Sequence, residues 1–422
     1  MALLVIVTIP TTELMVQAER STGTIRNDVV AANLVEQSLG TARSEPFSLL
    51  ISQAVPNGAA LTTTQTVGQI PYTVKLLTRW QATSATSGAC DNPANGTNGT
   101  SAVLFVEASV SWTGALTPLP TADTIIAPPS TYFSNAPDDG NLALTVTGSP
   151  TSTSPAPPQF NVPVTVTGPN GGTYTTDANG CLFLAYLAPG SYTISLNTAG
   201  WSDTQENTIS TETVTLVANQ TTTASMSYDL GGTLTTTLTG ATPAPIGLPV
   251  TITNSGLFTG TDTVTGGIGG TTVITPLWAY ANGYQAYAGR CPEANPAAQG
   301  ASGPLYTGAP TLPTAAVTRG GSATLPVTLY PFTVVLTSTS HASVAGWSVT
   351  VTEQAATGYA TVACANLATY PLVGLTSATG TLTAGMPLGH FTVTATSGAT
   401  SSSTSAQILP SAANTTASIT VP

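Results

Sequence analysis

The sequence has little charge of either sign. Its 422 residues include 7 lysines and arginines and 18 aspartates and glutamates, so charged side chains make up 6% and the formal net charge is −11. There is one lysine, Lys75, and there are two histidines, His341 and His390. Nucleic acids and anionic lipid headgroups are bound by clustered basic side chains. This shortage argues against both as partners, and we expect no nucleic acid partner.

Catalytic motifs are missing as well. The sequence contains no Gly-x-Ser-x-Gly, no His-Glu-x-x-His, no phosphate-binding glycine loop and no Cys-x-x-Cys. An enzyme would have to work with dispersed groups such as Asp177 or His390. The cysteines have no histidine nearby, which argues against a metal site. We therefore expect no enzyme activity, no cofactor and no metal.

The composition is that of an ordered, turn-rich chain. Glycine and proline number 40 and 32, without the Gly-X-Y period of collagen. Hydrophobic residues make up 41% of the chain, enough to offset the entropy lost on ordering. The length predicts about three or four domains.

The N-terminal segment predicts a helix. Residues 1–9 are nearly all apolar, and residues 17–43 contain neither proline nor a glycine pair. We expect one long helix over residues 1–45, with residues 1–17 in a membrane or a packed helical shaft and the rest on its own head domain. The alternative is a surface helix on a soluble core. The second half carries an apolar stripe at spacings of three and four residues, formed by Ile25, Val29, Ala32, Val35, Leu39 and Ala42.

The string MALLVIVTIPTTELMVQAERSTGTIRNDVVAANLVEQ resembles the N-terminal helix of type IV pilin-like proteins. This resemblance covers about a tenth of the chain. It implies a helix that anchors the precursor in the membrane and later packs in a filament core, with other pilin-like subunits as partners. The leader-cleavage motif of that family is absent, so we expect either that Met1 is an internal start or that processing is lost.

Residues 46–133 continue the resemblance. Alternating segments at 72–80 and 102–112 predict two strands around a polar loop, and residues 124–127 predict a short third strand. A helix followed by a small antiparallel sheet is the layout of pilin-like head domains.

The rest of the chain contains an internal repeat. VPVTVT (162–167), LPVTIT (248–253) and WSVTVT (347–352) recur about every 90 residues. Each copy is followed by a strand that begins with glycine near an aromatic residue: GSYTISL (190–196), GYQAYA (283–288) and GHFTVTA (389–395). Short strands at this period, without a helical stripe, predict tandem antiparallel β-sandwiches.

The first repeat resembles the prealbumin-like sandwich of carboxypeptidase regulatory domains and collagen-adhesin B-type stalks. This resemblance implies spacers or binding platforms rather than hydrolases. Residues 141–422 contain no lysine, which excludes the Lys–Asn isopeptide bonds of many such stalks. The sequence also has no sortase motif, so the N-terminal helix is the expected anchor.

The four cysteines, Cys90, Cys181, Cys291 and Cys364, allow three disulfide pairings. An exported location favours bridging. We prefer Cys291–Cys364, with free, buried cysteines as the alternative.

Three further patterns have two interpretations each. Asp177-Ala-Asn-Gly180 and Asp138-Asp-Gly140 contain calcium-binding residue types, but β-turns are favoured. Asn-x-Thr acceptors for N-glycosylation also arise by chance in threonine-rich sequence. Four aromatic residues could stack on a sugar, but core packing is favoured. The acceptors are Asn95, Asn98, Asn219 and Asn414, and the aromatic residues are Trp278, Tyr280, Tyr284 and Tyr287.

The sequence therefore predicts a mainly β protein with one long N-terminal α-helix, in which a pilin-like α+β head precedes tandem antiparallel β-sandwiches. We expect a cell-surface structural protein: a minor pilin or pseudopilin-like subunit of a type IV pilus or related filament, anchored in the membrane and presenting its repeats outward. The alternative is a surface adhesin or stalk that binds glycan or protein ligands without filament assembly. The predicted parts are a helix at 1–45, a head at 46–133, and repeats at 134–230, 231–330 and 331–422.

Overall fold

The structure is a computed structural model, and the described part of the chain divides into two compact units. The first is built from Met1–Thr147, Pro158–Thr198 and Ser210–Met226, and the second from Gly148–Pro157, Ala199–Ile209 and Ser227–Pro422. For residues 2–22, 263–264, 299–300 and 303–304 the backbone alone is described. The described residues are 2–47, 49–50, 61–82, 90, 102–115, 119–128, 139–151, 154–257, 260–264, 270–300, 303–306, 310–340, 343–354, 367–410 and 415–422.

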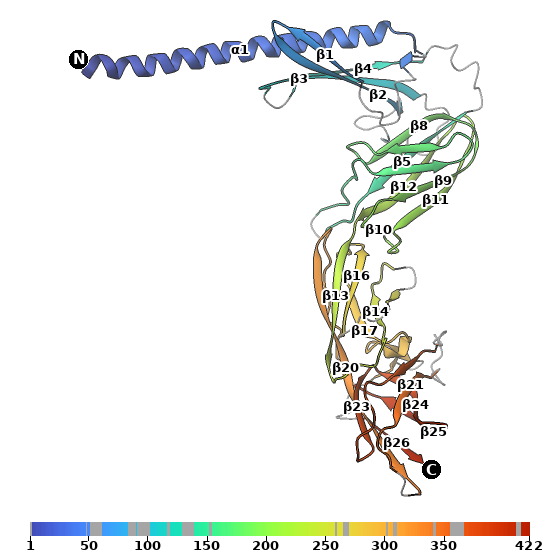
Figure 1. The fold of residues 1–422 in the computed structure, drawn as a ribbon. Helices are drawn as coiled ribbons and strands as arrows, with labels where there is room; N and C mark the ends of the chain where they lie inside the picture. The colour runs from blue at the N-terminus through green and yellow to red at the C-terminus, as the bar shows by residue number, and fades with distance from the viewer. Residues whose placement is uncertain are drawn as a thin grey trace. The chain divides into compact units, whose positions relative to one another are not determined.

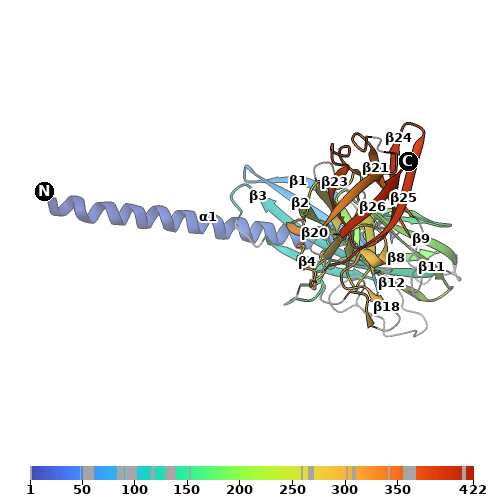
Figure 2. The same cartoon turned by 90° about the horizontal axis from the view of Figure 1, so that it is seen from below.

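The head consists of one helix and one antiparallel sheet. Helix α1 (Ala2–Ser44) is 43 residues long and contacts β2, β3 and β4 of the sheet. Figures 1 and 2 show α1 continuing past the sheet towards the N-terminus. The long helix predicted over residues 1–45 is confirmed. The sheet has the order β1-β2-β3-β4, formed by Leu61–Val67, Ile70–Ala82, Ala102–Trp112 and Thr121–Ile126.

The buried face of α1 differs in part from the predicted stripe. Val35, Leu39 and Ala42 are buried against the sheet, whereas Ile25, Val29 and Ala32 are exposed. The predicted stripe has a period shorter than the 3.6 residues of an α-helix, so it turns by about 100° between Ala42 and Ile25. The sheet is met instead by a face that also includes Ala31 and Leu34.

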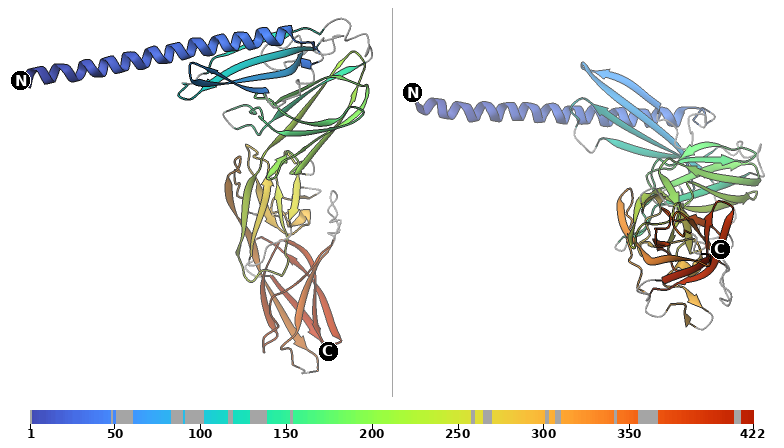
Figure 3. Two further views of the ribbon diagram at one scale, coloured as in Figure 1. Left: turned by 45° about the horizontal axis from the view of Figure 1, so that its top comes forward. Right: turned by 60° about the horizontal axis from the view of Figure 1, so that its bottom comes forward.

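Three β-sandwich modules follow the head. The sheet orders are β10-β12-β5-β8 and β11-β9-β6-β7 in the first, β16-β13-β20 and β15-β14-β17 in the second, and β26-β20-β23 and β22-β21-β24-β25 in the third. Figure 3 shows these modules in two further views. The strands are β5 (Gly140–Thr147), β6 (Pro163–Thr167), β7 (Gly172–Thr175), β8 (Cys181–Leu187), β9 (Gly190–Asn197), β10 (Trp201–Asp203), β11 (Ile209–Leu216), β12 (Thr221–Leu230), β13 (Gly232–Gly240), β14 (Val250–Thr253), β15 (Thr261–Val264), β16 (Thr271–Leu277), β17 (Gln285–Ala288), β20 (Ser322–Ser338), β21 (Ser348–Glu353), β22 (Thr369–Pro371), β23 (Thr381–Met386), β24 (Gly389–Ser397), β25 (Thr400–Ile408) and β26 (Thr415–Val421). The short 3-10 helix η2 (Pro292–Ala294) and the strand pair β18 (Gln299–Gly300) and β19 (Gly303–Pro304) lie between β17 and β20 in the chain.

The sequence repeat corresponds to the same strand pair in each module. The first halves of the three copies form β6, β14 and β21, and the glycine-led halves form their antiparallel partners β9, β17 and β24. The leading glycines Gly190, Gly283 and Gly389 have φ values of 151°, 67° and 130°, a region that L side chains rarely adopt. The repeat is therefore a structural unit of two paired strands whose entry turn requires glycine.

One strand belongs to two modules. β20 is 17 residues long and pairs in parallel with β13 through its first half. Its second half pairs in parallel with β26 and antiparallel with β23 (Figure 1). The domain boundary predicted between residues 330 and 331 thus falls inside a strand. The hydrophobic core of the second module continues into the third around this strand.

The observed architecture confirms the predicted fold class. It is mainly β, has a single N-terminal helix in the described chain, and places tandem sandwiches after an α+β head. The parallel pairs β13/β20 and β20/β26 are a feature that the sequence analysis did not predict.

Candidate functional site: the joints between modules

A disulfide ties the head to the first sandwich. Cys90, which follows β2, bonds to Cys181 at the start of β8, with a Cα–Cα distance of 5.6 Å. This is one of the three pairings that the cysteine count left open. It belongs to the same one of these pairings as the preferred Cys291–Cys364 pair. Cys291 is also disulfide-bonded. Cys364 lies outside the described residues, so its pairing with Cys291 stays a prediction.

Polar and aromatic contacts surround this disulfide. Arg79 Nη1 lies 3.1 Å from Asp177 Oδ2, with side chains that are 20% and 8% exposed. The Arg79 guanidinium also lies 4.6 Å from the centre of the Phe105 ring. Trp80 of β2 meets Tyr186 of β8 edge to face at 5.2 Å. The head and the first sandwich therefore share a covalent bond, an ion pair and a packed ring contact.

The loop around Asp177 is a β-turn, as favoured from the sequence. The Asp177 Oδ1 atom accepts hydrogen bonds from the backbone N–H groups of Asn179 and Cys181, at 2.8 and 2.9 Å. The Gly180 N–H bonds to the Asp177 carbonyl oxygen at 3.0 Å. Both carboxylate oxygens are thus used within the protein. No cluster of three potential metal ligands occurs in the part of the chain that the structure describes, and Asp138 of the second motif lies outside it.

Asp229 is a buried hydrogen-bond centre in the second unit. It is 1% exposed and lies near the end of β12. Its Oδ2 atom accepts hydrogen bonds from the N–H and the hydroxyl of Ser149, both at 2.9 Å. Its Oδ1 atom accepts from the Leu230 N–H at 2.8 Å and from Arg319 Nε at 2.5 Å. One carboxylate therefore holds together the segment after β5, the end of β12 and the segment before β20.

We expect Asp229→Ala to lower the free energy of unfolding of the second unit by about 3 kcal/mol. The change leaves two buried Ser149 donors without an acceptor, and each such group costs roughly 1–3 kcal/mol. Arg319 contributes little to the loss because its side chain is 52% exposed and water can solvate it. Urea unfolding followed by tryptophan fluorescence measures the change. The exposed Asp123→Ala is the matched control, and equal losses in both variants would contradict the role of Asp229.

The loop between β10 and β11 packs against the second module through Glu206. The Glu206 Oε2 atom accepts a hydrogen bond from the Trp278 N–H at 2.7 Å, and Oε1 is hydrogen-bonded to the hydroxyl of Tyr284. Tyr280 donates its hydroxyl proton to the carbonyl oxygen of Thr204. Gln205 Nε2 donates to the Gly256 carbonyl oxygen at 3.2 Å. Four contacts thus seat this short loop on one side of the second sandwich.

Contact between this loop and the second module changes the pKa values of Glu206, Tyr280 and Tyr284. Burial raises the pKa of Glu206 to about 7, against the lowering effect of its hydrogen bonds to Tyr284 and Trp278. Burial, followed by the nearby Glu206 charge, raises the pKa of Tyr284 and takes the pKa of Tyr280 to about 12. Glu206 is the group whose proton affinity is moved into the neutral range.

The predicted aromatic cluster is part of the core. Trp278, Tyr284 and Tyr287 are 3%, 0% and 4% exposed, and Tyr280 meets Tyr284 at 5.7 Å. Side chains buried to this extent cannot stack on a sugar from solvent. The core-packing interpretation is confirmed.

The histidine of the third repeat is paired with a carboxylate. His390 Nδ1 lies 3.4 Å from Glu293 Oε2, and the His390 N–H bonds to Glu293 Oε1 at 3.3 Å. Glu353, 3% exposed, accepts hydrogen bonds from the Tyr370 hydroxyl and the Ala368 N–H. Asp177 and His390, the two groups considered for catalysis, belong to different units, and each is occupied in a local contact. His341 lies outside the described residues.

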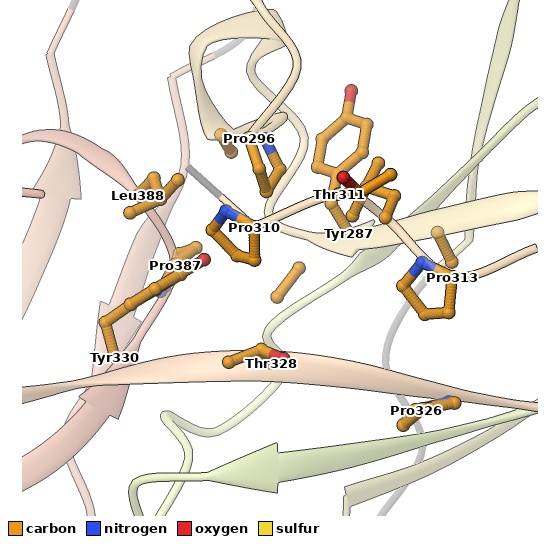
Figure 4. Close-up of a pocket in the computed structure, with 14 residues that line it drawn as sticks. Tyr287, Pro296, Pro310, Thr311, Pro313, Pro326, Thr328, Tyr330, Pro387 and Leu388 are labelled. Atoms are coloured by element: carbon orange, nitrogen blue, oxygen red, sulfur yellow. The ribbon is translucent and has the colours of Figure 1, made fainter. Parts of the chain in front are cut away.

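A proline-lined cavity lies in the second unit (Figure 4). Figure 4 shows Pro310 and Pro313 facing the strand that carries Pro326, Thr328 and Tyr330. Tyr330 is 8% exposed, and its hydroxyl has no hydrogen-bond partner among the residues that the structure describes. None of the 14 described residues that line the cavity is charged. Its described lining offers apolar surface and the hydroxyl-bearing side chains of Tyr287, Thr311, Thr328 and Tyr330.

Other predicted sites fall in different settings. Asn219 is exposed in the turn between β11 and β12, with a φ of 58° that suits asparagine. The acceptors Asn95, Asn98 and Asn414 lie outside the described residues.

Among the described residues, no helix is long and apolar enough to cross a membrane.

No protein-family model and no curated protein matches this chain. Solved structures that resemble it include the Bacillus anthracis TIE protein, at 13% identity and a TM-score of 0.21, over 86% of this chain and 73% of that one. The GBS52 minor pilin of Streptococcus agalactiae matches at 13% and 0.20, over 45% and 94%. The shaft pilin SpaA of Lactobacillus rhamnosus GG matches at 14% and 0.17, over 44% and 97%. TM-scores this far below 0.5 decide nothing about fold or function.

Proposed function

We propose that this chain is a cell-surface structural protein, a minor pilin or pseudopilin-like subunit of a type IV pilus or a related filament, which carries β-sandwich modules on a helix-bearing head. Other pilin-like subunits would bind along α1. Contact of residues 1–17 with a membrane remains part of this proposal.

The observation that carries the proposal is the division of α1 between a packed and an exposed part. Ala31, Leu39 and Ala42 are almost completely buried on the head sheet. Ile25 and Val29, six and two residues before Ala31 on the same helix, are 60% and 56% exposed. Large apolar side chains in solvent commonly mark contact surfaces. Helix α1 begins well before the part of it that lies on the head sheet. At 1.5 Å per residue, this preceding part is about 40 Å long and is available for packing with other subunits.

The joints support a structural role. A disulfide, an ion pair and an aromatic contact fix the head to the first sandwich. The second and third modules share β20 and a continuous core. Such joints are suited to holding modules in sequence, and the described residues show no catalytic arrangement at them.

We expect Val29→Asp to reduce assembly of the full-length protein at least tenfold. A charged side chain on the exposed face of α1 would have to be desolvated in a helix–helix contact. Electron microscopy and sedimentation of the full chain, produced with its assembly partners, measure the filament fraction.

Val273→Asp on β16 is the matched control, because Val273 is 58% exposed and Val29 56%. It should assemble like the unchanged protein. Filaments of Val29→Asp at the normal level, or an equal defect in Val273→Asp, would overturn the assembly role of α1.

The adhesin alternative has less support. Three of the four aromatic residues that could have bound a sugar, Trp278, Tyr284 and Tyr287, are buried. The described residues that line the proline-lined cavity include no charged group to select a ligand. Ligand binding by the sandwich modules therefore stays a prediction from the sequence.

A further inference from the structure

The hydrogen-bond geometry at Glu206 constrains where a proton lies. The Tyr284 hydroxyl oxygen is 2.7 Å from the Trp278 carbonyl oxygen and also lies against Glu206 Oε1. A phenol has one proton to donate, and a carbonyl oxygen can only accept. If Tyr284 donates to Trp278, the contact with Glu206 is a hydrogen bond only when the carboxyl group is protonated and donates to the phenol oxygen.

Burial disfavours ionised Glu206 and outweighs the hydrogen bonds from Tyr284 and the Trp278 N–H, which favour it. A Glu206 carboxylate would compete with the Trp278 carbonyl oxygen for the single Tyr284 proton. One of the two acceptors would then face an oxygen lone pair in a partly buried site, which is unfavourable. The chain Glu206 to Tyr284 to Trp278 is complete when Glu206 is neutral.

The charged and titratable groups around Glu206 come from three parts of the second unit. Asp203 lies next to this loop at the end of β10, Asp262 lies on β15, and Tyr280 and Tyr284 lie on the segment between β16 and β17. The two aspartates each raise the pKa of Glu206, after the larger effect of burial. No basic residue is among the groups that act on it.

We propose that Glu206 is a proton-operated lock that seats the loop between β10 and β11 on the second sandwich when its carboxyl group is protonated and releases the loop when it ionises. The remaining loop contacts depend on this seat. The Tyr280 bond to Thr204 and the Gln205 bond to Gly256 both form only while residues 203–207 lie against the second module. Asp203, which accepts the N–H groups of Gln205 and Asn207, keeps the loop in one shape in either state.

The direction of the pH effect follows from the carboxyl group. A folded-state pKa of about 7, above the ordinary 4.5, means that the seated loop binds the proton more tightly than the released loop. Seating is therefore strongest at low pH and weakens as the pH rises from about 4.5 through 7. The limit of this weakening is about 300-fold in the ratio of seated to released loop.

Hydrogen exchange of the full-length chain tests the lock. The protection of the Trp278 and loop amides, corrected for the intrinsic exchange rate at each pH, should fall by up to about 75-fold between pH 5 and pH 9, because part of the 300-fold limit lies below pH 5. Glu206→Gln should keep its protection constant over this range, because a carboxamide stays neutral and can donate to the phenol oxygen. Glu107→Gln, in the head, is the control and should keep the pH dependence of the unchanged protein.

A second measurement does not depend on a folded variant. In the unchanged protein with ¹³C-labelled glutamate, a carboxyl resonance should titrate with a midpoint near 7 and be absent from Glu206→Gln. A Glu206 midpoint near the ordinary 4.5 would overturn the lock. Loop protection that does not change with pH, or that changes equally in Glu206→Gln, would overturn it as well.

Discussion

Removal of the Cys90–Cys181 disulfide, as Cys90→Ala with Cys181→Ala, is expected to lower the free energy of unfolding of the first unit by about 4–5 kcal/mol. The bond closes a sequence separation of 91 residues, and the chain-entropy relation for a loop of this length gives about that value. For a unit of roughly 200 residues this corresponds to a fall of about 10 °C or more in the melting temperature. Alanine is the suitable replacement because Cys181 is 2% exposed. A serine at this position would place an unpaired hydroxyl group in the core.

The ion pair and ring contact around the disulfide should remain in this variant and hold the joint together at room temperature. Calorimetry of the oxidised protein measures the loss. Chemical reduction is a poorer test because Cys291 is disulfide-bonded as well. Arg79→Met is the informative companion, since it removes the ion pair to Asp177 and leaves the disulfide in place. A double alanine variant that melts within 2 °C of the unchanged protein would show that the disulfide adds no substantial stability to the first unit.

Phe332→Ala is expected to destabilise the second and third modules together by about 3–5 kcal/mol. Phe332 is 1% exposed, and removal of a phenyl ring from a packed core leaves a cavity as well as losing apolar burial. It lies on the second half of β20, opposite Ala384 of β23 and Thr415 of β26. Because β20 also forms the second module with β13, the damage should not be confined to the third.

Exchange rates of amides in β14 and in β24 measure the two modules separately in one experiment. Both should rise by a similar factor in Phe332→Ala. Thr337→Ala is the matched control on the same strand, because Thr337 is exposed and its loss should change stability by less than about 0.5 kcal/mol. Faster exchange in β24 with unchanged exchange in β14 would show that the two modules unfold independently despite the shared strand.

Local patterns predicted the strands and the repeats well. The pairs β6/β9, β14/β17 and β21/β24 could be found because a glycine turn followed by an alternating strand is a short-range signal. The shared strand could not be found in the same way. Pro326 and Pro331 lie within β20, and proline lacks the N–H group that a central strand donates, so the sequence there reads as a boundary.

The contacts that form the joints were beyond sequence reasoning for a different reason. The pairing of Cys90 with Cys181 depends on how the head sheet meets β8, and cysteine spacing contains no information about that. Glu206 follows Asp203 in a short polar loop that resembles any other hairpin connection. Its partners Trp278 and Tyr284 are more than 70 residues away. The one indication in the sequence was the aromatic cluster itself. Buried tyrosine hydroxyl groups need polar partners, so a polar group had to lie nearby.

The course of β20 determines how the two last modules would respond to tension. The chain enters them through β13, whose first residues pair with Ser322 and Ala323, and leaves through β26, whose last residue pairs with Ser338. Both strands run parallel to β20, one along each half. A pull between entry and exit therefore loads both ladders lengthwise, so that many backbone hydrogen bonds resist in shear at once instead of opening one after another. In this arrangement β20 bridges the junction between the two modules, and the force passes through the sheets rather than through a linker.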